Sequence, residues 1–323
     1  MHILVVGGAG YIGSCCSEYL LDRGHQVSIF DALLNGHRAA VDPRAKFIHG
    51  NLSDPSAINI ALRECRPDGI IHFAAFIEVG ESMRDPLKYF RNNLSNAINL
   101  CQAACEHKVR KIVFSSTAAV YGMPKQIPIT ESEPTLPINP YGEAKLMFEK
   151  VLRWQHELAG LQYTALRYFN AAGASQNYGE DHNPETHLIP LVMQAAEGKR
   201  EQVYIYGDDY DTPDGTCIRD YIHVLDLAQA HLLALKNDFC GSLNLGSGNG
   251  HSVHEVIDMV RKVAGREFKV ATQARRPGDP ARLIADSSAA RRILGWKPQF
   301  ENLQDIVQSA WNWRQRHPNG YAN

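Results

Sequence analysis

The sequence of 323 residues predicts an α/β fold, in which helices cover both faces of a doubly wound parallel sheet and a smaller α/β lobe follows. Apolar, strand-like runs alternate with helix-like stretches over the first half of the chain, as is typical of parallel sheets. From about Tyr168 this alternation gives way to segments rich in Pro, Gly, Asn and Asp. We therefore expect one domain over 1–167, to which a segment near 220–247 can return, and a second lobe over 168–323.

The first elements of the chain are a strand, a glycine-rich turn, a helix and a second strand. Residues 3–6 form an apolar run rich in β-branched side chains, which predicts a buried strand. The glycine-rich residues 7–13 end this strand, and the apolar spacing that follows predicts a helix as far as Gly24. Residues 25–30 predict a second strand, which ends on Asp31.

This order of elements is typical of a Rossmann-like unit that binds a dinucleotide. Gly7, Gly10 and Gly13 are spaced as G-x-x-G-x-x-G, which differs from the more common G-x-G-x-x-G. Glycines allow the backbone to approach a pyrophosphate, and the N-terminus of the next helix offers N–H donors and a positive dipole. Asp31 can accept hydrogen bonds from ribose hydroxyls and would repel a 2′-phosphate. The pattern therefore favours NAD over NADP.

The alternation of strands and helices continues as far as residue 167. Further strands are predicted at 47–49, 69–73, 111–115 and 163–167, and helices at 54–65, at 86–107 and from Pro140 to about Trp154. Beyond it we expect helices at 188–197, 220–235, 253–263 and 287–294 and a strand at 242–245. Ligands of parallel sheets bind beyond the carboxyl ends of the strands, where residues 7–10, 74–75 and 115–117 fall.

The helix that begins at Pro140 carries a candidate pair for proton transfer. Tyr141 and Lys145 lie four residues apart, so they share one face of the helix. A free tyrosine has a pKa of about 10, which is too high for a base at neutral pH. One cation at roughly 5 Å, in an effective dielectric of about 20, favours the phenolate by roughly 3 kcal/mol, or about two pKa units. A second cation, such as oxidised nicotinamide, would bring the pKa to about 7.

Composition and charge argue against several classes of protein. The formal net charge is −2 and no long basic run occurs, which disfavours a nucleic-acid partner. No apolar run reaches about 18 residues, so no membrane-spanning helix is predicted. Seven scattered cysteines without a C-x-x-C pair indicate reduced thiols in a cytoplasmic protein. Neither the cysteines nor the 14 histidines suggest a metal site.

Several motifs together are similar to those of the extended short-chain dehydrogenase/reductase superfamily. They are G-G-A-G-Y-I-G at 7–13, H-F-A-A at 72–75, V-G-E-S at 79–82, S-S-T-A-A-V-Y-G at 115–122, the Y-x-x-x-K pair and R-Y-F-N at 167–170. Residues 207–224 and R-R-P-G-D at 275–279 narrow the resemblance to the UDP-sugar 4-epimerases. The resemblance covers essentially the whole chain. It implies reversible, NAD-dependent C4 epimerisation through a 4-keto intermediate, with UDP-glucose and UDP-galactose as the expected pair.

The resemblance also implies which residues carry the chemistry. Tyr141 would be the general base and acid, Lys145 would hold the nicotinamide ribose and lower the tyrosine pKa, and Thr117 would hydrogen-bond the sugar 4-hydroxyl. Tyr141 then takes the O4 proton while C4 gives a hydride to NAD, and the flat intermediate turns over before the hydride returns. The residues implied to contact NAD are Gly7, Gly10, Tyr11, Ile12, Gly13, Asp31, Asn51, Leu52, Phe73, Ala74, Ala75, Asn92, Ser115, Lys145 and Tyr168.

A second group of residues is implied to anchor UDP while the sugar turns. Arg219 and Arg276 match positions that bind the diphosphate, as bidentate guanidiniums can. Asp279 matches an acceptor for the uridine ribose, and Asn170 matches a contact to the diphosphate or sugar. The other substrate contacts implied are Thr117, Tyr141, Leu188, Tyr204, Tyr206, Tyr221 and Leu283, with Leu188 and residues 204–206 at the uracil slot.

Three positions depart from the family pattern. Asn51 stands where an aspartate often contacts adenine, although its amide oxygen can still accept a hydrogen bond. Ile77 stands where some members place a lysine on the pyrophosphate. Leu283 falls at a gate whose size affects tolerance of an N-acetyl group, and leucine is intermediate between the large and small residues found there. UDP-N-acetylhexosamine, UDP-xylose and UDP-glucuronate therefore stay open as alternative substrates.

These residues also bear on three other functions that the same fold can carry. A 4,6-dehydratase needs an acid and a base to remove water across C5–C6. Dehydratases of the similar superfamily carry Asp-Glu directly after the threonine, where this chain has Ala118 and Ala119. A net reductase would exchange NAD(P)H at each turnover, which the sequence excludes less firmly. A non-catalytic protein that senses a dinucleotide has no need of Tyr141, Lys145 and Thr117 together. The resemblance further implies a homodimer, whose interface is formed by helices such as 86–107 and 141–158.

Overall fold

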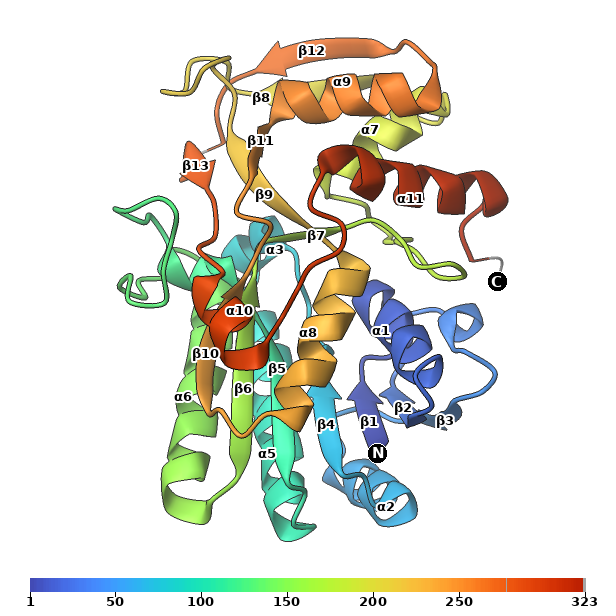
Figure 1. Cartoon of the computed structure of the whole chain (residues 1–323), viewed down its shortest axis with the longest axis vertical. Helices are drawn as coiled ribbons and strands as arrows, with labels where there is room; N and C mark the ends of the chain where they lie inside the picture. Colours follow the sequence, from blue (N-terminus) through green and yellow to red (C-terminus); the bar gives the residue numbers. More distant parts are fainter. Residues whose placement is uncertain (277, 322–323) are drawn as a thin grey trace.

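A computed structural model of the chain describes residues 1–276 and 278–321. Pro277 of the R-R-P-G-D motif and residues 322–323 lie outside the described residues. The larger part of the chain is built on one parallel sheet, and a smaller group of strands and helices lies beyond the carboxyl ends of its strands (Figure 1).

The large sheet has seven strands, all parallel, in the order β10-β6-β5-β4-β1-β2-β3. They are β1 (His2–Val6), β2 (Gln26–Asp31), β3 (Lys46–His49), β4 (Gly69–His72), β5 (Lys111–Thr117), β6 (Gln162–Tyr168) and β10 (Gly241–Leu245). The strand order reverses direction between β1 and β4. In open parallel sheets such a reversal is where a ligand binds.

Helices cover both faces of this sheet (Figure 1). On one face lie α1 (Tyr11–Leu21) and α8 (Val224–Lys236), and on the other lie α2 (Pro55–Cys65), α5 (Asn96–Glu106) and α6 (Pro140–Ala159). Successive side chains of β1 point to opposite faces, so Ile3 and Val5 join the first core while Leu4 and Val6 join the second. Because both faces are buried, residues 3–6 of the strand are all apolar.

The second lobe contains two smaller sheets. Strands β7 (Asn170–Ala172), β9 (Ile218–His223), β11 (Gly250–Ser252) and β13 (Arg282–Leu283) form one, and β8 (Gln202–Tyr206) pairs with β12 (Lys269–Gln273) in the other. Helices α7 (Leu188–Ala196), α9 (Val253–Ala264) and α11 (Leu303–Arg316) pack around a third core. The short helix α10 (Ser288–Leu294) packs instead on α8 and β10.

Side chains near the helix ends explain where several helices begin. Asp54 accepts hydrogen bonds from the N–H groups of Ser56 and Ala57, at 2.9 and 3.3 Å, and so caps α2 as predicted. Ser252 and Glu255 form a capping box at the start of α9. Both helices therefore start at signals that are visible in the sequence.

Two predicted helices differ from the structure. Residues 218–223 form strand β9, which pairs with β7, β11 and β13, and helix α8 begins only at Val224, so the helix predicted over 220–235 is wrong in its first part. The helix predicted over 86–107 consists of α4 (Pro86–Tyr89), a π-helical stretch at Phe90–Ser95 and α5. Helix α11 and the short strands of the second lobe were not predicted. The other predicted elements are confirmed, with ends shifted by a few residues.

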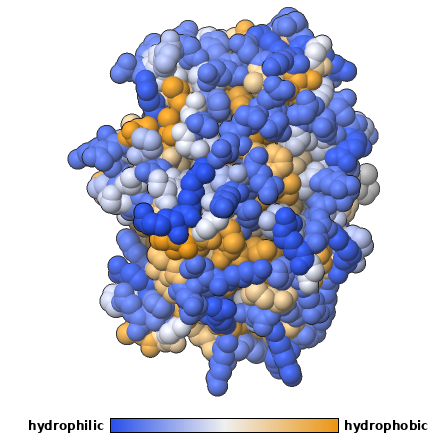
Figure 2. All heavy atoms as spheres, viewed as in Figure 1, coloured by the Kyte–Doolittle hydropathy of each residue, from blue (hydrophilic) through white to orange (hydrophobic). Residues whose placement is uncertain are grey.

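The two faces of the large sheet carry different surfaces. Figure 2 shows the side of α1 and α8 covered largely by hydrophilic residues, with apolar side chains gathered near its middle. On the opposite side, apolar side chains are exposed on α3 (Val79–Arg84), α4 and α6: Val79, Met83, Leu87, Trp154 and Leu158. Within 1–276 and 278–321, no helix is both long and apolar enough to cross a membrane.

Candidate active site

The turn between β1 and α1 requires glycine at two of its three predicted positions. Gly7 has a φ of 85°, and a Cβ there would lie 2.5 Å from the Ala74 nitrogen. A Cβ on Gly13 would lie 2.1 Å from the Gly7 carbonyl oxygen. Gly10 has a φ of −85°, and its Cβ would meet only the Gly7 oxygen, at 3.5 Å. Because neither the backbone nor the packing of the chain requires glycine at residue 10, this position indicates a group that approaches the turn from outside.

The N-terminus of α1 has N–H groups that no side chain caps. Its N-cap residue is Gly10, and its first turn contains no acidic residue. Such a terminus attracts phosphate through its N–H groups and its dipole. The side chain of Tyr11 is engaged elsewhere, because its hydroxyl donates to the Gly173 carbonyl at 2.6 Å. Tyr11 can therefore offer its backbone, but not its hydroxyl, to a ligand at the turn.

Two predicted acceptors keep capacity for a ligand. The carboxylate oxygens of Asp31 accept hydrogen bonds from the N–H groups of Ala9 and Leu33, at 2.9 and 2.8 Å. The side-chain oxygen of Asn51 accepts one from the Ser53 N–H at 2.9 Å. Each of these oxygens has a second lone pair, so ribose or adenine donors can still be accepted.

The segment after β4 is held close to the glycine turn. The N–H groups of Phe73 and Ala74 both donate to the Val6 carbonyl, at 2.8 and 3.1 Å. Asn92, in the π-helical stretch, donates to the side-chain oxygen of Asn93 at 2.9 Å. The other predicted NAD contacts of the first lobe, Ile12, Leu52 and Ala75, are buried or half-buried on α1 and on the loops that follow β3 and β4.

Helix α6 brings Tyr141 and Lys145 to the carboxyl end of β5. Asn139 caps the helix, since its side-chain oxygen accepts a hydrogen bond from the Gly142 N–H at 2.8 Å. A Cβ on Gly142 would lie 2.6 Å from the Ala119 carbonyl oxygen. Glycine therefore lets the first turn of α6 pack tightly against the short helix that follows β5.

Lys145 is a buried cation. Its side chain is 2 % exposed, and its ammonium donates to the Ser115 carbonyl at 2.7 Å. The ammonium lies 4.8 Å from the centre of the Phe114 ring and 5.9 Å from that of Tyr141. Burial lowers the pKa of Lys145 to about 7, although the field of Glu149 opposes this effect.

Burial has the largest effect on the pKa of Tyr141. Burial raises the pKa of Tyr141 above its ordinary value, and a hydrogen bond with the Thr117 hydroxyl offsets only part of this rise. Burial therefore sets the net direction of the Tyr141 pKa, and the lowering by Lys145 together with a second cation stays a prediction. Burial outweighs the lysine, whose ammonium lies 5.9 Å from the ring centre and is itself destabilised by burial. A further cation must act before the phenolate can form near neutral pH.

The ends of β5 and β6 complete this part of the site. The hydroxyls of Ser115 and Tyr168 are buried and hydrogen-bonded to each other, and burial raises the pKa of Tyr168. The Thr117 hydroxyl accepts a hydrogen bond from the Ala119 N–H at 3.1 Å. Its own hydrogen therefore remains available to a ligand or to Tyr141.

Glu149 is a buried part of the site that the sequence analysis missed. Its carboxylate accepts three hydrogen bonds from Arg167, at 3.0, 3.2 and 2.5 Å, and further ones from the hydroxyls of Ser116 and Ser242. It lies one helical turn beyond Lys145 and raises the pKa of that lysine. The spacing of Tyr141, Lys145 and Glu149 at four-residue intervals was the signal that could have revealed it.

The second lobe carries the predicted anchor for a nucleotide. Arg219 and Asp279 form an ion pair with each other, and Arg219 also donates to the Ile218 carbonyl at 2.9 Å. Arg276 is exposed, and its guanidinium lies 4.0 Å from the centre of the Tyr206 ring. Among the described residues, no carboxylate forms an ion pair with Arg276.

The other predicted substrate residues lie on neighbouring elements of this lobe. Tyr204 lies beside Tyr206 on β8, with ring centres 6.4 Å apart. Asn170 donates to a backbone carbonyl of β9 at 3.0 Å, and Tyr221 is buried in the third core. Leu188 opens α7, and Leu283 packs against an apolar cluster that includes Leu146 of α6.

The chain path joins the two groups of residues. Tyr168 ends β6, Asn170 begins β7, and β7 pairs with β9, which carries Arg219. The glycine turn and the ends of β4, β5 and β6 therefore face the strands of the second lobe (Figure 1). An uncapped helix terminus, an acid at the end of β2 and a glycine that the chain itself does not need together fit a dinucleotide such as NAD.

Comparisons with known proteins agree with this geometry. The model of the NAD dependent epimerase/dehydratase family matches residues 3–246. The UDP-glucose 4-epimerase of Halalkalibacterium halodurans is 52 % identical over 328 residues, which cover 100 % of this chain and 98 % of that protein. A crystal structure of a UDP-glucose 4-epimerase has a TM-score of 0.97 at 48 % identity and covers 100 % of both chains. That of the enzyme from Bifidobacterium longum, in complex with NAD+ and UDP, has a TM-score of 0.94 at 40 % identity and covers 99 % of this chain and 100 % of that one.

Proposed function

The chain belongs to the NAD dependent epimerase/dehydratase family, and on this premise we propose that it is an enzyme that reversibly inverts C4 of a UDP-sugar, with UDP-glucose and UDP-galactose as its substrate pair. The observation that carries the proposal is similarity over the whole chain, at 52 % identity, to a UDP-glucose 4-epimerase. Tyr141, Lys145 and Thr117, which such a reaction needs, stand together at the end of β5.

The cofactor is NAD, which accepts a hydride from the sugar C4 and later returns it. The glycine turn and the N–H groups of α1 hold its pyrophosphate, and Asp31 accepts from its adenosine ribose. The Lys145 ammonium has three hydrogens, and the Ser115 carbonyl takes one of them at 2.7 Å. The others are available to the nicotinamide ribose.

Tyr141 moves the proton of the sugar 4-hydroxyl. Its phenolate accepts the proton as the C4–H bond breaks and the C4=O4 double bond forms, and the phenol returns the proton when hydride comes back to the other face of C4. Thr117 donates to the sugar O4 and keeps it within reach of Tyr141. Burial holds the pKa of Tyr141 high. Lys145 is placed to support the phenolate, and a bound oxidised nicotinamide would supply the further positive charge.

The second lobe anchors UDP while the hexose turns over. Arg219 and Arg276 bind the diphosphate, Asp279 accepts from the uridine ribose, and Tyr204 and Tyr206 flank the uracil. The ion pair between Arg219 and Asp279 holds these two groups next to each other. Charged residues hold the nucleotide, while the surroundings of the sugar are weakly polar. The sugar can therefore rotate while UDP stays bound.

The experiment that tests this function uses purified protein with no added cofactor. UDP-galactose, UDP-N-acetylgalactosamine, UDP-xylose and UDP-glucuronate are incubated separately, and the C4 epimer of each is quantified. We expect fastest conversion of UDP-galactose, and loss of at least about a hundredfold in rate for Tyr141→Phe with NAD still bound. Product that forms only after NADH or NADPH is added would assign a reductase instead, and no product under either condition would refute an enzymatic function on these sugars.

We also propose that two copies of the chain associate through the α3–α6 side of the sheet. The exposed apolar residues Met83, Leu87, Trp154 and Leu158 support this, because large apolar patches mark interaction surfaces. Leu87→Asp should shift the mass measured by light scattering from dimer to monomer, while Ile60→Asp on α2, which is also exposed, should not.

The seven free cysteines support a reducing, cytoplasmic location.

A further inference from the structure

Glu180, His182, Glu185 and His187 bring four potential ligand atoms within 4.8 Å of one another. They lie on the stretch between β7 and α7, outside the site described above. Glu180 Oε1 lies 3.1 Å from His182 Nδ1 and 2.8 Å from His187 Nδ1. Glu185 Oε1 lies 2.9 Å from the same His187 nitrogen.

These contacts outnumber the hydrogens that could serve them. His187 Nδ1 carries at most one hydrogen, yet it faces two carboxylate oxygens at 2.8 and 2.9 Å. Glu180 Oε1, in turn, faces two imidazole nitrogens. Glu185 Oε1 also accepts hydrogen bonds from the N–H groups of Thr186 and His187, both at 2.8 Å. Two imidazole nitrogens and two carboxylates thus gather in one region, and these are the side chains that commonly bind a metal ion.

Among the described residues, no lysine or arginine forms an ion pair with either carboxylate. The side chains of Glu180 and Glu185 are 9 % and 5 % exposed. In 1–276 and 278–321, only the two histidines form ion pairs with them. Buried carboxylates need compensation of their charge. One divalent cation would neutralise both and leave both imidazoles neutral, the form in which histidine binds metal.

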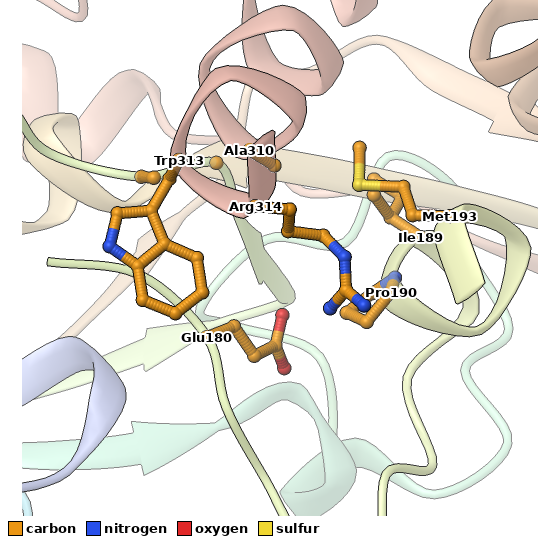
Figure 3. A pocket seen from close by; sticks show the side chains of 9 residues that line it. Glu180, Ile189, Pro190, Met193, Ala310, Trp313 and Arg314 are labelled. Carbon is orange, nitrogen blue, oxygen red and sulfur yellow. The ribbon is translucent and has the colours of Figure 1, made fainter. Parts of the chain in front are cut away.

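Arg314, which lines the same small cavity as Glu180, does not fill this role. Figure 3 shows the Glu180 carboxylate beneath Arg314 and Trp313 of α11. Arg314 is engaged with Glu197, to which it donates two hydrogen bonds at 2.9 and 2.7 Å. The cavity between these side chains measures about 10 Å³, which holds about one water molecule.

We propose that Glu180, His182, Glu185 and His187 form a closed structural site for one Zn²⁺ ion. Two nitrogens and two oxygens at about 2.0–2.2 Å match tetrahedral zinc, and ligand atoms around such an ion lie about 3.3–3.5 Å apart. The observed contacts of 2.8–3.1 Å and the 4.8 Å limit bracket this spacing, so small side-chain shifts suffice. The spacing E-x-H-x-x-E-x-H differs from common zinc patterns, which is why the sequence predicted no metal.

The position of the ion gives it a structural role. The His182 ring meets the Tyr11 ring edge to face, with centres 6.1 Å apart. Tyr11 belongs to α1, directly after the glycine turn, and its hydroxyl holds the Gly173 carbonyl. Helix α7 begins at Leu188, immediately after His187. An ion here would fix the stretch 173–187 between the start of α1 and the start of α7.

Metal content and affinity test the proposal directly. Untagged protein, purified without chelators, should contain about one zinc per chain by mass spectrometry. After removal of the metal, titration of Zn²⁺ in competition with a chromophoric chelator should give one tight site, and Zn²⁺ should raise the melting temperature. His187→Gln should weaken this binding by about a hundredfold or more. His254→Gln, at an exposed histidine of α9, should bind Zn²⁺ as the parent protein does.

A second titration guards against a His187 variant that fails to fold. Co²⁺ added to the metal-free parent protein should give the strong visible absorption of a tetrahedral site, and Zn²⁺ should abolish it. Parent protein that takes up neither ion would overturn the proposal, as would a folded His187→Gln that binds Zn²⁺ unchanged. The four residues would then be a hydrogen-bonded cluster with a protonated imidazole.

Discussion

Alanine substitutions at Gly10 and Gly13 test two different reasons for glycine in this turn, namely the approach of a cofactor and the packing of the chain. At Gly13 a Cβ would lie 2.1 Å from the Gly7 oxygen and 2.8 Å from the Gly8 Cα, both backbone atoms of the same turn. Backbone must shift, and overpacking of this kind costs about 1–3 kcal/mol or more. At Gly10 the φ is −85° and the one contact lies at 3.5 Å, so alanine should change the free energy of unfolding by less than about 1 kcal/mol.

Gly10→Ala should nevertheless impair NAD binding. The new methyl group would occupy the space through which a pyrophosphate reaches the N–H groups of α1. We expect at least about tenfold weaker binding, which corresponds to about 1.4 kcal/mol. Urea denaturation gives the stability, and calorimetric titration of nucleotide-free protein gives the affinity for NAD.

Gly160→Ala is the control for this experiment. Gly160 ends α6 with a φ of 74° and open space around it, so alanine should cost stability through the backbone without changing NAD affinity. A Gly10→Ala protein that binds NAD as tightly as the parent would refute the reasoning that the cofactor meets this turn. Unchanged stability of Gly13→Ala would refute the packing argument.

Three further predictions concern the charged groups. The pKa of Lys145 falls from about 10.5 unfolded to about 7 folded, so the folded state binds fewer protons in this range and stability from this group rises with pH. Between pH 7 and 9 the free energy of unfolding of nucleotide-free protein should therefore rise by about 2 kcal/mol more than that of Lys145→Met, and equal slopes would show that the lysine is not buried. Glu149→Gln should lower the free energy of unfolding by about 3–5 kcal/mol, because it leaves the buried Arg167 without a counter-charge. The double variant Glu149→Gln with Arg167→Met should lose less than the single variant. A larger loss in the double variant would contradict this. Arg276→Ala should weaken UDP binding while stability stays within about 0.5 kcal/mol, and Arg275→Ala, whose guanidinium is paired with Asp209, should leave UDP affinity unchanged; equal losses of UDP and NAD affinity in Arg276→Ala would make the residue structural.

Strands of the large sheet could be predicted because apolar surroundings lie on both of their faces. Strand β1 is buried on both faces, so residues 3–6 are a continuous apolar run that identifies a strand without knowledge of its neighbours. Strand β9 could not be recognised in this way. Its Asp220 carboxylate is buried and accepts hydrogen bonds from the N–H groups of Ser247, Gly248 and Ala285, at 2.7, 3.0 and 3.0 Å. Those partners come from distant parts of the chain, and the local sequence does not show them.

The site residues also differ in whether local sequence or the tertiary fold brings them together. Tyr141 and Lys145 are related by helical spacing, so local sequence predicts that they act together. The ion pair of Arg219 with Asp279 joins residues 60 positions apart and depends on the pairing of β9 with β13. The pKa of Tyr141 depends on burial by side chains from several elements, which a pairwise estimate for Lys145 does not include.

The central claim is that C4 is inverted by direct, reversible hydride transfer within one active site. It is tested by incubating the purified protein with UDP-galactose that carries deuterium at C4, in ordinary water and without added cofactor, and measuring the isotope in the UDP-glucose formed. Direct transfer predicts that deuterium stays at C4 of the product. Replacement of that deuterium by hydrogen from water would mean that C4 is deprotonated instead, and would contradict the mechanism.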